Sequence, residues 1–212
     1  FETAGRQKIT PPDPEVPQDT EAAAFFDVDN TLIQGSSLIL LAQGLFKKRF
    51  ITLSELAPAL RKQIRYRVSG SENADDIAEG REQALAIVKG KSVEELKQAC
   101  REIVDNRMLQ KSYADTIELA SMHLAAGQQV WLVSATPVQI GQALAETLGF
   151  TGALGTVAEE EDGKFTGRLV GDILHGPGKK HAVAALAALQ QLDLSKCTAY
   201  SDSINDLPML EM

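Results

Sequence analysis

The chain has 212 residues, enough for one large domain or for a core domain with an inserted module. Its formal net charge of -8 argues against nucleic acid as a partner, because an acidic surface repels a phosphate backbone. The sequence has no apolar segment long enough to span a bilayer and no secretory signal pattern. We therefore expect a cytoplasmic protein that binds neither nucleic acid nor a membrane.

The amino-terminal segment, residues 1–21, is rich in Pro, Glu and Asp, which predicts a disordered or loosely attached tail. Apolar residues make up 44% of the whole chain, so a sizeable core can form behind this tail. The two cysteines, Cys100 and Cys197, have neither metal-ligand spacing nor a local partner. We expect both to be buried, reduced thiols.

The first predicted strand, residues 22–26, is uniformly apolar and runs directly into Asp27-Val28-Asp29-Asn30-Thr31. Two carboxylates so close together repel each other and lose solvation. A divalent cation is the simplest way to offset both costs. One carboxylate can then act as a nucleophile and the other as a general acid and base, as in an aspartate-based phosphatase. The alternative is an Asp/Asn-rich turn that only closes the strand.

The next eighty or so residues predict helices and contain no strand candidate. Residues 37–48 are apolar on most faces, and a last helix at about 112–126 leads back to the core. Start signals are the capping boxes Thr52/Glu55 and Ser92/Glu95 and the N-cap Asp75; stop signals are Gly70, Gly90 and Gly127. This stretch is typical of a helical insertion.

From Gly127 onward, strands and helices alternate. The pattern predicts a strand at 129–133, a helix at 137–148 with Thr136 as its N-cap, short strands within 153–174 joined by a hairpin turn at 161–164, a helix at 179–191 and a buried strand at 197–200. Such alternation favours an α/β fold with a parallel sheet, in which ligands gather at the carboxyl ends of the strands.

Polar residues follow three of the predicted strands at those carboxyl ends. They are Asp27 and Asp29, then residues 134–136, and then residues 201–206. Ser134 can supply a hydroxyl donor, and the free N–H groups of the helix that follows it suit an anion. The alternative is that Ser134 and Thr136 serve only as helix caps.

A lysine and two further acids join this set. Lys179 lies at the amino end of a predicted helix, where the helix dipole disfavours a cation, and a phosphate dianion in front of it would explain its presence. The alternative is a solvated lysine, as for Lys180. Asp202 and Asp206 bring the acids to four, which predicts Mg²⁺. An Asx turn capped by Ser203 would explain Asp206 but not Asp202.

Taken together, these residues resemble the haloacid dehalogenase (HAD) superfamily, in particular its subfamily IB, the phosphoserine-phosphatase-like branch. The four motifs, in order, are Asp27-Val28-Asp29-Asn30-Thr31-Leu32, Val133-Ser134-Ala135, Lys179, and residues 200–210 around Asp202 and Asp206. The interval of 23 positions from Lys179 to Asp202 (202 − 179) favours Lys179 over Lys180. The resemblance implies a Rossmann-like core at 22–35 and 119–212, with a helical cap inserted at 36–118.

The resemblance also implies roles for the residues. Asp27 would form an aspartyl-phosphate, and Asp29 would protonate the leaving oxygen and then activate water. Mg²⁺ would be held by Asp27, Asp202, the backbone carbonyl of Asp29 and, directly or through water, Asp206. The phosphoryl group would be bound by Ser134, Ala135, Lys179 and Asn205.

Departures from the family pattern matter more for the substrate than for the chemistry. Ser36 stands where phosphoserine phosphatases carry a glutamate that meets the substrate's amino group, so phosphoserine itself is in question. The fourth motif reads Ser-Asp-Ser in place of Gly-Asp-Gly, and the chain stops soon after it, where the family continues with a further strand and helix.

The expected function is hydrolysis of a small phosphorylated metabolite with Mg²⁺. Two alternatives stay open: a phosphotransferase or the regulatory part of a larger enzyme, and a non-catalytic binding protein with the same fold. The complete set of motif residues argues against the last.

Overall fold

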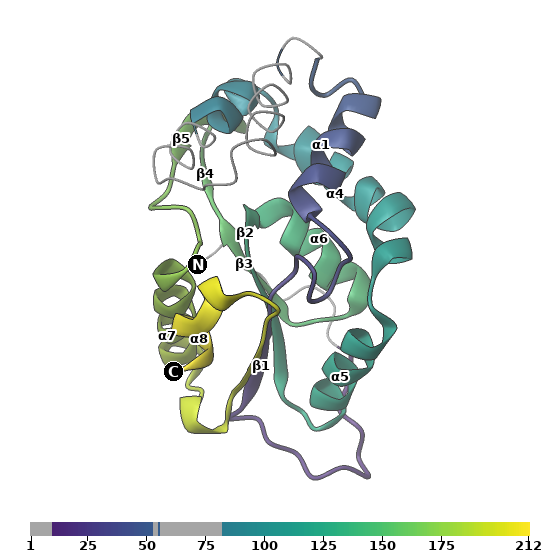
Figure 1. The fold of residues 1–212 in the computed structure, drawn as a ribbon, viewed down its shortest axis with the longest axis vertical. Coiled ribbons are helices and arrows are strands. Elements are labelled where there is room, and N and C mark those ends of the chain that lie inside the picture. Colours follow the sequence, from purple (N-terminus) through teal and green to yellow (C-terminus); the bar gives the residue numbers. More distant parts are fainter. Residues whose placement is uncertain (1–9, 53–54, 56–81) are drawn as a thin grey trace.

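The computed structural model describes residues 10–52, 55 and 82–212, and its centre is a four-stranded parallel sheet (Figure 1). The strands are β1 (Ala23–Phe26), β2 (Gln129–Pro137), β3 (Gly152–Thr156) and β6 (Thr198–Tyr200), in the spatial order β3-β2-β1-β6. The predicted α/β fold with a parallel sheet is confirmed.

The apolar run before Asp27 forms β1 because a central parallel strand is buried on both faces. Its residues alternate between two cores: Ala24 and Phe26 face one cluster, Ala23 and Phe25 the other. In the register of the sheet, Phe26 lies opposite Leu132 of β2 and Tyr200 of β6. The residues that follow these three positions therefore emerge at the same edge of the sheet.

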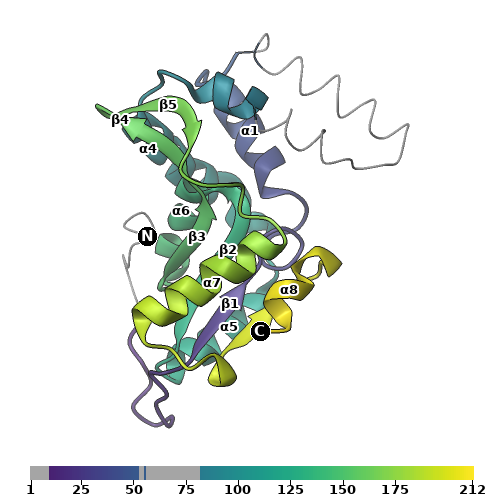
Figure 2. The ribbon, with the colours of Figure 1, turned by 90° about the vertical axis from the view of Figure 1, so that its left-hand side faces the viewer.

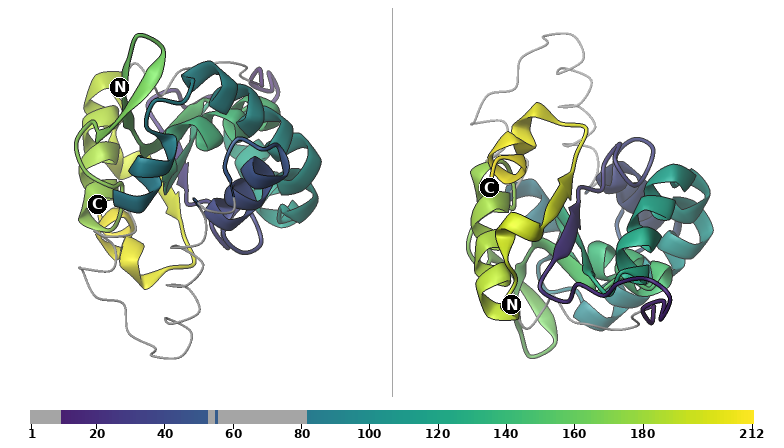
Figure 3. Two further views of the ribbon diagram at one scale, coloured as in Figure 1. Left: turned by 90° about the horizontal axis from the view of Figure 1, so that it is seen from above. Right: turned by 90° about the horizontal axis from the view of Figure 1, so that it is seen from below.

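Helices cover both faces of the sheet (Figures 1 and 3). On one face, α5 (Ala114–Ala125) and α6 (Val138–Leu148) pack against β1, β2 and β3. On the other, α7 (Pro177–Gln190) packs with the short helix α8 (Leu207–Leu210). This arrangement leaves the carboxyl ends of the strands for the loops that carry polar residues.

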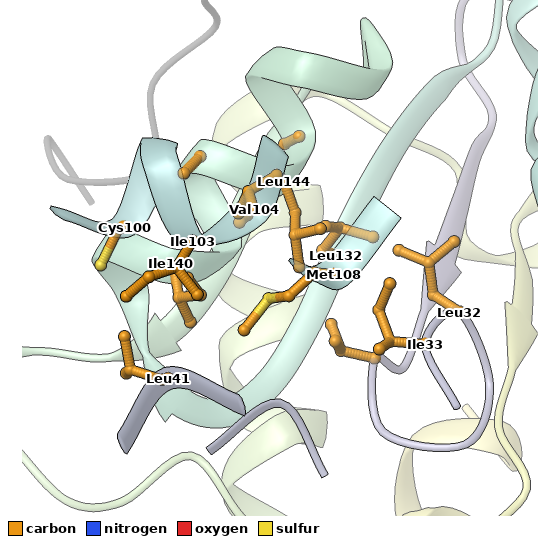
Figure 4. Packing of buried hydrophobic residues seen from close by; sticks show 14 of the residues in the cluster. Leu32, Ile33, Leu41, Cys100, Ile103, Val104, Met108, Leu132, Ile140 and Leu144 are labelled. Atoms are coloured by element: carbon orange, nitrogen blue, oxygen red, sulfur yellow. The ribbon is translucent and has the colours of Figure 1, made fainter. Parts of the chain in front are cut away.

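The segment between β1 and α5 extends the hydrophobic cluster that contains Ala24 and Phe26 beyond the sheet. It contains α1 (Ser37–Lys47), α4 (Val93–Ile103), a π-helical turn (Val104–Met108) and a 3₁₀ turn (Leu109–Lys111). Side chains from α1, α4 and α6 meet in one cluster, with Leu41, Ile103 and Ile140 among them (Figure 4). The helices α1 and α4 approach closely at Gly44, where an added Cβ would lie 2.5 Å from the side chain of Ile103. The division into a core and a cap at 36–118 stays a prediction.

A β-hairpin lies beside this helical segment (Figure 2). Its strands are β4 (Ala158–Glu161) and β5 (Lys164–Leu169), and the predicted turn between them is confirmed because Asp162 and Gly163 both have positive φ. Gly90 N–H donates to the Phe165 carbonyl at 2.7 Å, and Val93 N–H donates to the Gly163 carbonyl at 3.0 Å. The hairpin is therefore fastened to the start of α4.

Most of the residues that were predicted to begin or end helices do so in the structure. Ser92 Oγ accepts the Glu95 N–H at the start of α4, and Glu55 and Thr52 exchange hydrogen bonds as a capping box. The stop signals Gly90 and Gly127 have positive φ, and so does Gly149, which follows the end of α6. The proposed cap Asp75 and the stop Gly70 lie outside the described residues.

Three expectations are wrong. Thr136 does not cap α6, because β2 continues to Pro137, which pairs with Thr156 of β3. The last strand is not buried: Thr198 is exposed and its neighbours are half-buried, since β6 is an edge strand. Cys197 is likewise only half-buried, whereas Cys100 is buried as expected, and both thiols are free.

Residues 10–21 run along the ends of two helices, with turns at 14–15 and 20–21. The Thr10 N–H donates to the Gly149 carbonyl after α6, and the N–H groups of Asp13 and Asp19 donate to the carbonyls at the end of α5.

Among the residues that the structure describes, no helix is both long and apolar enough to cross a membrane.

Candidate active site

The loop after β1 places two carboxylates at the carboxyl edge of the sheet. The Asp27 N–H donates to the Tyr200 carbonyl at 2.9 Å and so continues the pairing of β1 with β6. Beyond it the chain turns sharply, with Asn30 at a φ of 57° and the Ile33 N–H returning to the Val28 carbonyl. Asp27 is buried, whereas Asp29 is half-buried.

Lys179 lies between two of the acids. Its Nζ is 2.6 Å from Asp27 Oδ1 and 2.6 Å from Asp206 Oδ2, and all three residues are buried. The Ser201 hydroxyl donates to the same Asp206 oxygen at 2.7 Å. The neighbouring Lys180 is exposed. The structure therefore brings together residues from three separate motifs and distinguishes the two adjacent lysines.

Burial raises the pKa of Asp27 from 3.8 to about 6. Lys179 opposes this increase by attraction and by its hydrogen bond, while the charge of Asp206 adds to it. A carboxylate must be ionised to act as a nucleophile. The lysine therefore helps to keep Asp27 in its reactive form in a place that would otherwise favour the neutral acid.

Thr31 connects the first motif with the loop after β6. Its Oγ1 accepts the Asp202 N–H at 3.0 Å and lies 3.4 Å from both Asp27 Oδ2 and Asp202 Oδ1. Asp202 itself is exposed. A single hydroxyl thus lies between the two carboxylates that were expected to share a metal ion.

Asp29 points toward α1. Its Oδ1 accepts the Ser37 N–H at 2.9 Å and also the Ser37 hydroxyl. No short-range sequence motif marks Ser37, because its side chain meets Asp29 only through the fold of the intervening loop.

The second motif lies at the end of the neighbouring strand. Ser134 is buried, and its Oγ lies 2.9 Å from Thr136 Oγ1. The Ala135 carbonyl accepts a hydrogen bond from Thr156 Oγ1 at 2.6 Å. In the described part of the chain, no hydrogen bond joins Ser134 to Asp27 or Lys179.

Asn205 lies in the loop after β6 and is exposed. Its N–H donates to Ser203 Oγ at 3.2 Å, and no hydrogen bond of its side chain is found among the described residues. The side chain is therefore available to a ligand at this edge of the sheet.

The donor chemistry of the site fits a hard divalent cation. Carboxylate oxygens are the ligands that Mg²⁺ prefers, and it commonly takes one or two of them together with water and substrate oxygens. Asp27 and Asp202, on either side of the Thr31 hydroxyl, meet that requirement. Within the described ranges no three acidic, His or Cys side chains form a ready-made metal cluster, so the expected ligand set of Asp27, Asp202, Asp206 and the Asp29 backbone carbonyl stays a prediction.

One further cluster lies behind the site. His123 Nε2 is 2.8 Å from the Tyr200 hydroxyl, and the Tyr200 ring stacks on Phe26 with centroids 4.5 Å apart. The structure therefore places His123 of α5 in the packing against β1 and β6.

Comparison with known proteins adds family evidence. The sequence profile described as haloacid dehalogenase-like hydrolase matches residues 24–211. The chain is 52% identical over 200 residues to phosphoserine phosphatase SerB1 of Mycobacterium tuberculosis (strain ATCC 25618 / H37Rv), covering 94% of this chain and 65% of that protein. It is also 30% identical to a histidinol-phosphatase of Neisseria meningitidis serogroup C (strain 8013), covering 89% of this chain and 86% of that protein.

Among solved structures, a protein with unknown function from Bordetella pertussis Tohama I superimposes with a TM-score of 0.77 at 27% identity. That match covers 91% of this chain and 87% of the other. The chain spans only 65% of the length of the Mycobacterium relative, so the longer protein contains sequence that has no counterpart here.

Proposed function

The chain belongs to the haloacid dehalogenase-like hydrolase family, and we propose that it is a magnesium-dependent phosphomonoesterase that works through an aspartyl-phosphate. The observation that carries the proposal is the position of Lys179, which contacts both Asp27 and Asp206 in a buried cluster at the carboxyl edge of the sheet. A lysine there offsets the charge of an attacking carboxylate and of an incoming phosphate.

Asp27 attacks the phosphorus atom in line, and the bond from phosphorus to the alcohol oxygen breaks. Asp29 gives its proton to that oxygen as the alcohol leaves. Asp29 then takes a proton from water, and the resulting hydroxide attacks the phosphorus of the aspartyl-phosphate. Inorganic phosphate departs, and Asp27 and Asp29 return to their starting states.

The phosphoryl oxygens are bound by donors from the other motifs. Lys179 supplies a positive charge beside the nucleophile. Ser134 and Ala135 supply a hydroxyl and a backbone N–H from the end of β2, and Asn205 supplies an amide from the loop after β6. Preorganised donors of this kind stabilise charge as the transition state spreads it over the phosphoryl oxygens.

Asp27, Asp202, the Asp29 carbonyl and Asp206 would hold Mg²⁺. The ion, when bound, neutralises phosphoryl charge and orients the phosphate for in-line attack. Thr31 keeps the loops that carry Asp27 and Asp202 at a set separation, because its hydroxyl lies 3.4 Å from both carboxylates.

The substrate is a small phosphorylated metabolite, and residues 36–118 form the cap that selects it. The helices α1 and α4 of that segment share a core with α6 of the sheet domain, which supports a cap stacked on this part of the fold. The two relatives are named for the phosphates of serine and histidinol, both of which are amino alcohols. Because Ser36 stands in place of the expected glutamate, the site lacks one carboxylate that could bind an ammonium group. This difference favours a substrate other than phosphoserine.

Phosphate release from a panel of monoesters tests the proposal. The panel includes phosphoserine, histidinol phosphate and p-nitrophenyl phosphate, each with and without Mg²⁺, and compares the native protein with Asp27→Asn. The surface variant Asp172→Asn is the matched control, because it makes the same change at an exposed position outside the site. Magnesium-dependent release that only Asp27→Asn abolishes supports the proposal. No release from any monoester by a folded protein contradicts it, and transfer to added alcohols in place of water would indicate a phosphotransferase.

A further inference from the structure

The carboxylate of Asp29 is bound by the first residue of α1. Asp29 Oδ1 accepts both the backbone N–H of Ser37, at 2.9 Å, and the Ser37 hydroxyl. Ser37 is fully buried, so water does not compete for its hydroxyl at the surface. The second acid of the first motif is thus tied to a helix that begins eight residues later.

The loop between them is built to allow this contact. Asn30 has a φ of 57° and Gly35 a φ of 81°, so the loop contains two residues in the left-handed region. Asn30 Oδ1 accepts the Gly35 N–H at 2.9 Å, and this hydrogen bond joins the two ends of the loop. The Ser37 N–H then arrives beside Asp29.

Asp29 takes the place of the usual helix cap. Ser36 occupies the N-cap position of α1, but its side chain makes no capping hydrogen bond. The Asp29 carboxylate instead accepts the N–H of Ser37 in the first turn of α1. The orientation of this carboxylate and the start of α1 are therefore determined together.

The two carboxylate oxygens of Asp29 are in different situations. Oδ1 is occupied by two donors from one residue, whereas within the described residues Oδ2 makes no hydrogen bond. Two donors on Oδ1 restrict the rotation of the carboxylate and direct Oδ2 away from α1. A small error in the placement of a proton donor lowers its rate steeply, so such a restriction has a catalytic value.

We propose that Ser37 is a positioning residue that holds Asp29 ready to protonate the leaving group. The inference rests on the proposed phosphatase activity, in which the proton on Asp29 passes to the alcohol oxygen while the bond from that oxygen to phosphorus breaks. Ser37 exchanges no proton itself. Because α1 begins at Ser37, correct placement of α1 becomes a condition for protonation.

The chemistry of the leaving group separates positioning from a general structural role. An alkyl alkoxide is a strong base and needs the proton as it departs, whereas p-nitrophenolate is a weak base and leaves without one. Loss of the Ser37 hydroxyl should therefore slow an alkyl phosphate and spare p-nitrophenyl phosphate. The parameter to compare is kcat/KM, since it is unaffected by the later hydrolysis of the aspartyl-phosphate.

The experiment measures kcat/KM of the native protein, Ser37→Ala, Asp29→Asn and the control Ser121→Ala on p-nitrophenyl phosphate and on the best alkyl phosphate. General acids contribute about 10²–10⁴-fold, and Ser37→Ala keeps the backbone donor, so we expect a loss of about tenfold on the alkyl ester and less than about twofold on the aryl ester. Ser121 is exposed, and among the described residues its hydroxyl donates only to the Ile117 carbonyl of its own helix, so its removal should change neither value.

The ratio of the two kcat/KM values is measured within one preparation, so partial unfolding of a variant does not alter it. An unchanged ratio in Ser37→Ala, whether both values fall or neither does, overturns the positioning role. An unchanged ratio in Asp29→Asn overturns it as well, because Asp29 is then not the proton donor. A native protein that hydrolyses neither ester marks the failure of the proposed function itself.

Discussion

Replacing Lys179 by methionine tests the electrostatics of the site. Methionine retains most of the apolar stem of the lysine and removes only the charge that lies 2.6 Å from Asp27 and from Asp206. Two buried carboxylates then face each other without a counter-ion. Breaking a buried ion pair by deleting one partner costs about 3–5 kcal/mol. We expect the free energy of unfolding of Lys179→Met to fall by about 4 kcal/mol, which lowers Tm by roughly 12 °C in a domain of this size.

The loss should depend on pH in a defined direction. Burial already raises the pKa of Asp27 to about 6, and Lys179 opposes that increase, so its removal raises the pKa further. A carboxyl whose folded pKa lies above its unfolded value destabilises the fold at higher pH and ceases to do so once it is protonated. The difference between native and variant Tm should therefore be largest near pH 7.5 and should shrink toward pH 5.

Thermal unfolding in magnesium-free buffer at the two pH values measures this effect, with Lys180→Met as the matched control. Lys180 is the next residue and is exposed, so the same substitution there should change Tm by only a degree or two. A loss in Lys179→Met no greater than that of the control, or one that grows as the pH falls, would refute the ion-pair account.

Two further predictions concern the metal and the helical segment. Protonation of Asp27 competes with Mg²⁺, so with a pKa of about 6 only about a tenth of the carboxyl is ionised at pH 5. The apparent Kd for Mg²⁺, taken from the increase in Tm on titration, should be about tenfold weaker at pH 5 than at pH 7.5, and equal values would contradict a metal bound to Asp27. Gly44→Ala should lower the free energy of unfolding by about 1–3 kcal/mol, because its Cβ would lie 2.5 Å from Ile103. Denaturant unfolding checks this, and an unchanged midpoint would mean that α1 and α4 separate without cost.

Much of the site follows from the sequence because strand ends can be located from hydrophobic runs. The apolar run before Asp27 and the strands before Ser134 and Ser201 are neighbours in a parallel sheet, so their carboxyl ends meet at one edge. Spacing within the family pattern also distinguished Lys179 from Lys180. In the structure Lys179 is buried against the acids, whereas Lys180 is exposed; the phosphate-binding role of Lys179 stays a prediction.

Other features depend on tertiary contacts that local patterns do not encode. The end of β2 extends to Pro137 because β3 pairs with it after a register shift, which overrides the local signal for a helix start at Thr136. The exposure of Thr198 depends on the position of β6 at the edge of the sheet. The contact of Asp29 with Ser37 depends on the loop that folds between them.

The most direct test of the central claim is to trap the intermediate. Asp29→Asn is mixed with Mg²⁺ and p-nitrophenyl phosphate, whose leaving group needs no proton, so the aspartyl-phosphate forms but its hydrolysis lacks a general base. The reaction is quenched with acid during turnover, and peptides are analysed by mass spectrometry. We predict one phosphoryl group on Asp27. Release of p-nitrophenol with no phosphoryl group on Asp27, or with the group on another residue, would contradict the account.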